Sequence, residues 1–177
     1  MATIQGQPEN KNMLSQIGFR FSVKRLPSVS FFASRINMPG LTLNAVPVPT
    51  PFKVINMAAD KLEYGEFSVT FKVDEDMGNY LEIFDWMVGI GFPTKFDERK
   101  QLVANGQNSP GTGIFSDGTL MINSSAKNPN MEVTFIDLLP VSLSDLDFTT
   151  QASDVDYLEA TVSFKFLYYT ITRLKRS

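Results

Sequence analysis

The 177-residue sequence contains neither cysteine nor histidine. Without cysteine there can be no disulfide and no thiolate nucleophile, and without histidine the commonest general base and the commonest transition-metal ligand are missing. Ser–His and Cys–His catalysis are therefore excluded, and any enzyme would depend on carboxylates or lysine. Because no pair of carboxylates stands at a convincing spacing, we expect no catalytic residue, no cofactor and no metal.

Long apolar runs and a strong net charge are also missing. No stretch of about 18 apolar residues could span a bilayer and no charged-then-apolar leader is evident, so we expect no membrane insertion and synthesis in the cytosol. The net charge is −3 with a pI of about 5.0, which argues against a protein that binds nucleic acid along its length. With 43% hydrophobic residues, the chain can bury one core, and we expect a single domain over residues 1–177.

The clearest strand and the clearest helix lie between Ile55 and Gly91. From Glu66 to Val73, apolar and polar residues alternate, which is the period of a strand with one buried face. Asp74 and the two acids after it are cap candidates, and a calcium loop is the weaker alternative because its closing glutamate is absent. We expect a helix over about 77–89 that packs on a sheet through an apolar stripe. The stripe consists of Tyr80, Leu81, Phe84, Met87 and Val88.

Alternation predicts further strands on both sides of this unit. Strands over 17–24 and 29–36 are expected to form a hairpin, a strand from Met131 is expected to end at Pro140, and the final strand, 157–171, is expected to be the longest. Short connections favour antiparallel pairing. The predicted fold class is α+β and mainly antiparallel β, with about six to eight strands in a barrel or sandwich and one flanking helix.

Three segments depart from this alternation. Residues 1–12 are polar, and we expect either an arm ordered by a partner or a disordered tail. Residues 46–60 contain three prolines that should force them out of the sheet as a projecting loop: a connector, an arm that reaches a neighbouring subunit or, as a minor alternative, an SH3 ligand. Apolar residues that need a partner favour the arm. They are Val48, Phe52, Val54, Ile55 and Met57. Residues 92–130 are expected to form an irregular insertion that holds a small hairpin with its turn at Asp117–Gly118.

The polar faces of three predicted strands share one arrangement, with small hydroxyl side chains in the middle and charged side chains at the ends. The hydroxyl residues are Ser22, Ser68, Thr70, Thr161 and Ser163. An ordinary solvent-facing sheet accounts for this arrangement as well as a specialised surface does.

Several motifs follow one another in an order that resembles the tail tube proteins of contractile-tailed bacteriophages. The central motif runs from Ile55-Asn56-Met57-Ala58-Ala59-Asp60, through the alternating strand and the acidic turn, to Phe84-Asp85-Trp86 on the helix. The flanking motifs are Asn12-Met13-Leu14, Asn37-Met38-Pro39-Gly40, Leu138-Leu139-Pro140-Val141 and Asp145-Leu146. The segment from Phe92 to Asn130 is longer than in the short form of the family.

The resemblance implies a structural protein and not an enzyme. It implies rings of six subunits whose sheets join into one barrel around a channel, with the polar strand faces lining the lumen and DNA as passing cargo only. It also implies stacking of rings, sheath and baseplate proteins as partners, and a place in the virion tail after assembly in the host cytoplasm. Two alternatives remain open: a specialised ring that starts or ends the tube, and a ring like those of type VI secretion. A carboxylate-dependent enzyme is a distant third.

Overall fold

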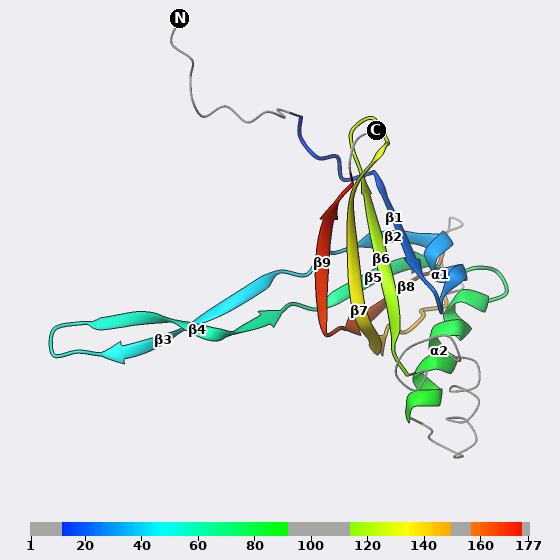
Figure 1. The fold of residues 1–177 in the computed structure, drawn as a ribbon. Coiled ribbons are helices and arrows are strands. Elements are labelled where there is room, and N and C mark those ends of the chain that lie inside the picture. Colours follow the sequence, from blue (N-terminus) through cyan, green and yellow to red (C-terminus); the bar gives the residue numbers. More distant parts are fainter. Residues whose placement is uncertain (1–11, 92–113, 150–156, 175–177) are drawn as a thin grey trace, which may run out of the picture.

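The computed structural model describes residues 12–91, 114–149 and 157–174 (Figure 1). The elements in chain order are β1 (Phe19–Val23), α1 (Pro27–Phe32), β2 (Ala33–Ile36), β3 (Leu41–Pro49), β4 (Val54–Tyr64), β5 (Phe67–Lys72), α2 (Gly78–Gly91), β6 (Ser116–Asn123), β7 (Pro129–Leu143), β8 (Glu159–Lys165) and β9 (Tyr168–Arg173). The predicted N-terminal arm, and residues 92–113 of the predicted insertion, lie outside the described residues apart from Asn12.

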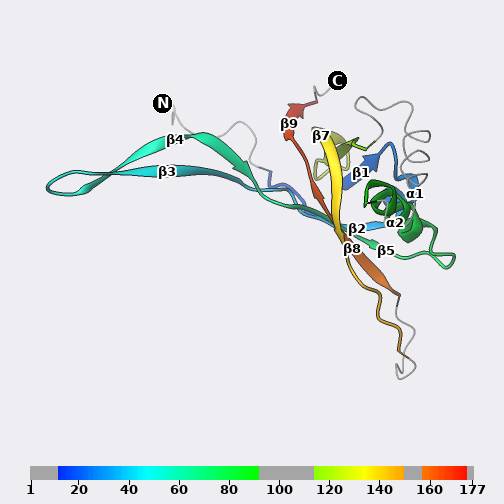
Figure 2. The same cartoon turned by 90° about the horizontal axis from the view of Figure 1, so that it is seen from below.

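The described strands form a seven-stranded antiparallel sheet and a separate two-stranded one. The larger sheet has the order β1-β6-β7-β8-β5-β2, with β9 paired to β7, and β3 pairs with β4 alone. The prediction of a mainly antiparallel fold is therefore confirmed. The larger sheet is sandwich-like and does not close into a barrel (Figure 2).

Strand β7 belongs to both halves of this sheet. Its first part pairs with β6 and β9 and, with β1, forms what we call the first half-sheet. Its last part, 139–143, pairs with β8 and forms the second half-sheet with β5 and β2. Between these parts, Asp137 has a φ of 57° and the register with β6 shifts, as at a β-bulge. The bulge lets one strand turn from one layer into the other.

Two predictions about strand ends are wrong, and each fails beside an irregularity in β7. The final strand is interrupted at Phe166–Leu167, opposite the bulge, so β8 and β9 replace the expected single strand, and the 15-residue β7 is the longest. Pro140 does not end β7 but lies buried inside it, beside a register shift in the pairing with β8. Bulges are positions where a strand tolerates proline.

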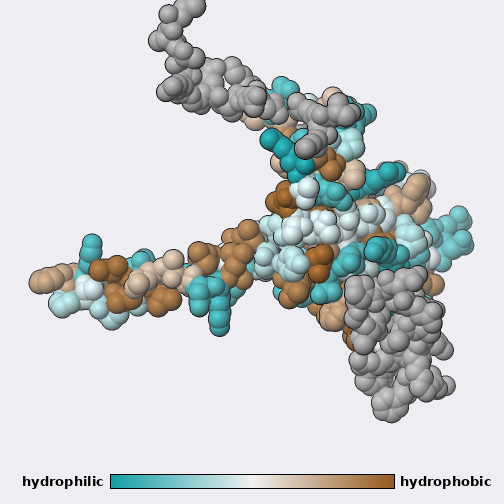
Figure 3. Space-filling model, viewed as in Figure 1, coloured by the Kyte–Doolittle hydropathy of each residue, from teal (hydrophilic) through white to brown (hydrophobic). Residues whose placement is uncertain are grey.

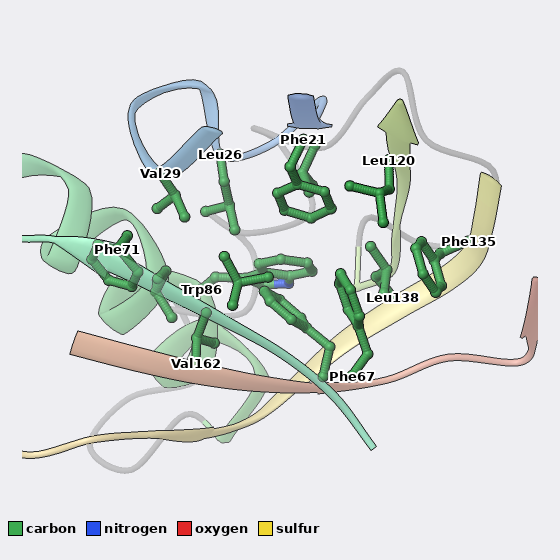
Figure 4. Packing of buried hydrophobic residues seen from close by; sticks show 14 of the residues in the cluster. Phe21, Leu26, Val29, Phe67, Phe71, Trp86, Leu120, Phe135, Leu138 and Val162 are labelled. Atoms are coloured by element: carbon green, nitrogen blue, oxygen red, sulfur yellow. The ribbon is translucent and has the colours of Figure 1, made fainter. Parts of the chain in front are cut away.

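The core lies between the two half-sheets and beneath α2 (Figure 4). The Phe67 ring stacks on that of Phe135 with 4.3 Å between centroids, and it lies 5.5 Å from Phe21. These rings come from β5, β7 and β1, so they join both half-sheets. Burying such side chains stabilises the fold by about 1.5–3 kcal/mol each.

Helix α2 is found where it was predicted, but it turns a different face to the core. The buried residues are Asn79, Ile83, Trp86 and Gly89. The prediction that Leu81 and Phe84 pack inward is wrong, since both are 47% exposed. Of the rest of the predicted stripe, Tyr80 and Met87 pack against the core and Val88 is half-buried. Both stripes have helical spacing, and the fit of Trp86 into the core selects between them.

The start of α2 follows the predicted capping. The Gly78 amide donates to Asp74 Oδ1 at 3.2 Å, and the Asp74 amide donates to Asn79 Oδ1 at 3.3 Å. Asn79 Nδ2 donates to the Lys72 carbonyl at 2.7 Å. These bonds satisfy groups that would be unpaired where the strand gives way to the helix.

Two predicted turns are wrong. The expected hairpin between the first two strands is replaced by α1, which begins at Pro27, a favoured first-turn residue. Leu26 and Val29 are fully buried there, and β1 and β2 pair with β6 and β5 in different half-sheets. Asp117–Gly118 lies inside β6, not at a turn; the β6–β7 turn comes later, at 124–128.

Candidate assembly surfaces

Four of the predicted hydroxyl residues form one patch on the outer face of the second half-sheet. Ser68 lies opposite Ser163 and Thr70 opposite Thr161 in the β5–β8 ladder. Their neighbours along each strand are buried, so these four side chains point away from the core. Oγ1 of Thr70 and Oγ1 of Thr161 are hydrogen-bonded at 3.0 Å. We call these four residues the hydroxyl patch.

The charges at the ends of the hydroxyl patch compensate one another. Lys72 lies opposite Glu159 at one end, and continuing the same register by one residue brings Glu66 opposite Lys165 at the other. Two positive and two negative side chains therefore flank the patch. A surface of this kind is hydrated but offers neither a net charge nor an apolar area to a passing molecule.

Ser22, the fifth predicted hydroxyl residue, lies on the outer face of the first half-sheet. It belongs to a row across four strands in which each member is opposite the next. The row is Ser22, Thr119, Thr134 and Thr170. Because the two half-sheets pack on the same core, their outer faces diverge, and Ser22 does not share a surface with the hydroxyl patch. Sequence reasoning missed the three threonines, although the alternation in β6 carries a signal for Thr119.

The second candidate surface is the β3–β4 hairpin, which we call the arm. It projects from the body of the subunit (Figure 1), where the sequence predicted a projecting loop over 46–60. The expectation that its prolines exclude a ladder is wrong, because Pro47 and Pro49 lie in β3 opposite Asn56 and Val54. The Thr50 amide donates to the Lys53 carbonyl, so alternation directs the two proline nitrogens to the free edge, where no ladder bond is lost.

The ladder divides the five predicted contact residues of the arm. Val48 lies opposite Ile55, and Met57 opposite Val46, so these share a face. Val54 is on the opposite face, and Phe52 lies in the turn, where it is 99% exposed. Hydrophobic residues, coloured brown, are visible along the arm in Figure 3.

The arm is attached to the body at its base. The Tyr64 ring lies 5.5 Å from each of the Phe166 and Tyr169 rings. The Tyr169 hydroxyl donates to the Pro39 carbonyl at 3.2 Å. The Gly65 amide donates to the Gly40 carbonyl at 2.9 Å. Beyond the base, the arm is a two-stranded ribbon with no core of its own. Such ribbons are at best marginally stable in water.

Over 12–91, 114–149 and 157–174, no three aspartate or glutamate side chains gather as a metal site would require. Within the same ranges no helix has the length and apolarity to cross a membrane. A cavity of about 220 Å³ opens near the β6–β7 turn, and among the described residues of its lining Arg173 is the one with a charge.

Comparisons with known proteins give matches in structure alone. No family model and no curated protein matches the sequence. The tube-terminating cap of the anti-feeding prophage matches with a TM-score of 0.65 at 9% identity, over 98% of this chain and 100% of that one. The PVC sheath/tube terminator, from an extracellular contractile injection system, matches with a TM-score of 0.63 at 12% identity, over 92% of this chain and 98% of that one. A chain of the PVC sheath–tube complex matches with a TM-score of 0.58 at 12% identity, over 93% of this chain and 94% of that one.

These neighbours are structural components and not enzymes. The fold expected from the sequence resemblance is confirmed, because the chain has the fold of tube and tube-terminating proteins of contractile injection systems.

Proposed function

We propose that this chain is a structural subunit that assembles with copies of itself into the tube of a contractile injection machine and catalyses no reaction. The observation that carries the proposal is the arm, which holds apolar side chains in water on a ribbon without a core. A monomeric protein has no use for such an element, whereas an assembling one covers it. The shared fold with tube and terminator proteins supports the same role.

The ring would form through the edges of the second half-sheet. This half-sheet has the order β2-β5-β8-β7, and the outer edges of β2 and of residues 139–143 in β7 have no strand partner among the described residues. Unpaired edges can pair with another chain, and identical copies joined edge to edge close into a ring. The resemblance to tail tubes supplies the expectation of six copies.

In such a ring the hydroxyl patch would line the channel. Ser68, Thr70, Thr161 and Ser163 would present hydroxyls with compensated charges to the cargo, so that the wall neither holds nor repels it strongly. The resemblance to phage tail tubes supplies the cargo, the partners and the location in this proposal. DNA would pass through the channel, and sheath and baseplate proteins would be partners. The subunit would be built into the virion after assembly in the host cytoplasm.

A terminating ring is the second candidate. The two terminators give higher TM-scores, 0.65 and 0.63, than the chain of the sheath–tube complex at 0.58. A terminator would use the same ring contacts but stack on one side only. A tube-initiating ring and a type VI-like tube ring use the same architecture.

Electron microscopy of the purified full-length protein tests these roles. Rods of uniform diameter are expected for a tube subunit, and rings of one or two layers for a terminator. Monomers at every concentration and salt tried would overturn both.

A further inference from the structure

The arm continues the strand pair at one end of the second half-sheet. In the body, β2 and β5 pair as far as Ile36 and Val69, and in the arm β3 and β4 pair from Leu41 and Tyr64 onwards. Both strands have the same number of residues in between, so the register passes from the body into the arm without a slip. Figure 2 shows the arm leaving the body in line with β2 and β5. The residues between the two ladders therefore set the direction of the arm.

The ladder is interrupted between the body and the arm. Residues 37–40 and 65–66 lie outside the strands, and we call them the joint. On the body side of the joint, the side chain of Asn37 makes bonds that backbone groups make in a regular ladder. Its Oδ1 accepts from the Ser68 amide at 2.6 Å, and its Nδ2 donates to the Glu66 carbonyl at 2.9 Å.

On the arm side, the joint contains two glycines that face each other. The Gly65 amide donates to the Gly40 carbonyl at 2.9 Å, and a Cβ built on Gly65 would lie 3.3 Å from the Gly40 nitrogen. Pro39, beside them, has no N–H to donate to the opposite strand. Glycine also has more backbone freedom than other residues. The backbone of the joint can therefore bend, and it does not fix the direction of the arm by itself.

Aromatic side chains connect the arm to the body at the joint. Tyr64 is the last residue of β4, and its ring meets the rings of Phe166 and Tyr169 edge to face, with 5.5 Å between centroids in each pair. Both of these body rings lie beside fully buried Phe135, at 5.3 and 5.7 Å. The Tyr169 hydroxyl also donates to the carbonyl of Pro39, which is buried. Both strands that lead into the arm are thus held by residues packed on the core.

We propose that the joint is a hinge and that Tyr64, held by Phe166 and Tyr169, is the latch that fixes the direction of the arm. This inference goes beyond the proposed function, because it concerns the single subunit and holds whether or not copies assemble. An arm of about 10 residues is about 33 Å long, so a swing of about 20° at the joint moves its tip by about 11 Å. Aromatic pairs prefer defined geometries, so two such pairs at the base oppose that swing.

Distances between nitroxide spin labels test the latch, because the chain has no native cysteine. One label is attached to Arg20→Cys, on exposed β1, and the other to Lys53→Cys, in the turn at the tip of the arm. Double electron–electron resonance is measured on the monomeric fraction of the full-length chain. We expect a narrow distance distribution when Tyr64 is present. In Tyr64→Ala the distribution should be broader by about 11 Å, the displacement of the tip in such a swing.

Two further variants separate the latch from general effects of substitution. Leu62→Ala is the matched control: it shortens an exposed apolar side chain two residues from Tyr64 and should keep the native width. Tyr169→Phe keeps the ring and removes only the hydrogen bond to Pro39, so it should broaden the distribution less than Tyr64→Ala does. Circular dichroism checks that the variants keep the native β-sheet signal.

A second label pair locates the motion. Lys53→Cys and Glu63→Cys both lie on the arm, so their distance distribution should be the same with Tyr64 and with Tyr64→Ala. Broadening of this pair would show that the ribbon loses its own structure, and it would overturn the hinge. A Tyr64→Ala distribution between Arg20→Cys and Lys53→Cys as narrow as the native one, or a native one equally broad, would overturn the latch. These outcomes leave the proposed function standing.

Discussion

Trp86 shows how a single side chain sets the rotation of a helix. It is 1% exposed, its Nε1–H donates to the Ile114 carbonyl at 2.8 Å, and its ring lies 6.2 Å from that of Phe164. The Arg25 guanidinium lies 5.2 Å above the ring, and burial lowers the pKa of Arg25. A large side chain with its polar atom satisfied anchors α2 to β8 and to the segment that leads into β6.

Replacing Trp86 by alanine should lower the free energy of unfolding by about 3–5 kcal/mol, as for other buried aromatics. Phe84→Ala on the same helix is the matched control. It should cost less than about 1 kcal/mol, because half-exposed Phe84 leaves no cavity when truncated. Denaturant titration followed by circular dichroism measures both. Equal losses would show that α2 uses the other face.

Gly118 marks a position where the core has no room for a side chain. A Cβ built there would overlap Cδ1 of Leu138, which is itself fully buried. Gly118→Ala should therefore cost about 1–3 kcal/mol by overpacking. Leu138→Val removes carbon from the opposing side chain, so the double variant should lose less than the sum of the two single losses. Strictly additive losses in the double-mutant cycle would refute this contact.

At the scale of elements, strands β3 and β5 both pair in antiparallel ladders, but their side chains have different roles. In β5 one face is buried and the other is hydroxylated, so the strand separates core from surface. In β3, Pro47 and Pro49 point their nitrogens to the free edge, which discourages another strand from pairing there. In the proposed assembly, partners would therefore contact the faces of the arm and not that edge.

Single cysteines in the hydroxyl patch can test whether the patch lines the proposed channel, because the chain has no native cysteine to react. Thr70→Cys and Thr161→Cys should react with a bulky maleimide several-fold more slowly in assemblies than in free subunits. Glu75→Cys, on the exposed loop before α2, is the control and should react equally in both. Equal rates at residues 70 and 161 in the two states would place the patch on an outer surface.

At the scale of the whole molecule, opposite charges nearly cancel, but some apolar side chains stay exposed. The chain carries a net charge of −3, the hydroxyl patch is flanked by compensating charges, and the arm exposes apolar side chains. Burial of apolar surface, not attraction between charges, is then the main force available for assembly.

Assembly should therefore survive high salt. Raising the ionic strength from about 0.1 to 1 M shortens the Debye length from about 10 to 3 Å, which weakens exposed ion pairs but not apolar contacts. The concentration for half-maximal assembly, measured by sedimentation velocity, should stay the same or fall. Dissociation at 1 M salt would mean that ion pairs hold the copies together.

Local patterns in the sequence determined the elements whose signal is short-range. Alternation predicted β5 and β8, including the outward hydroxyls of Ser68 and Ser163, and helical spacing with Asp74 as a cap predicted α2 to within two residues at its end. The absence of cysteine and histidine excluded whole classes of chemistry. These features depend on residues close together in the chain, so the sequence alone was sufficient.

Only the tertiary structure decided which faces meet. Phe84 and Trp86 both fit a helical stripe, and contacts with Ile114 and Phe164 select Trp86. The row from Ser22 to Thr170 exists only because four strands distant in sequence pair in one register. A sequence pattern sets the period of an element, but its orientation and partners depend on packing against residues far along the chain, which no local pattern encodes.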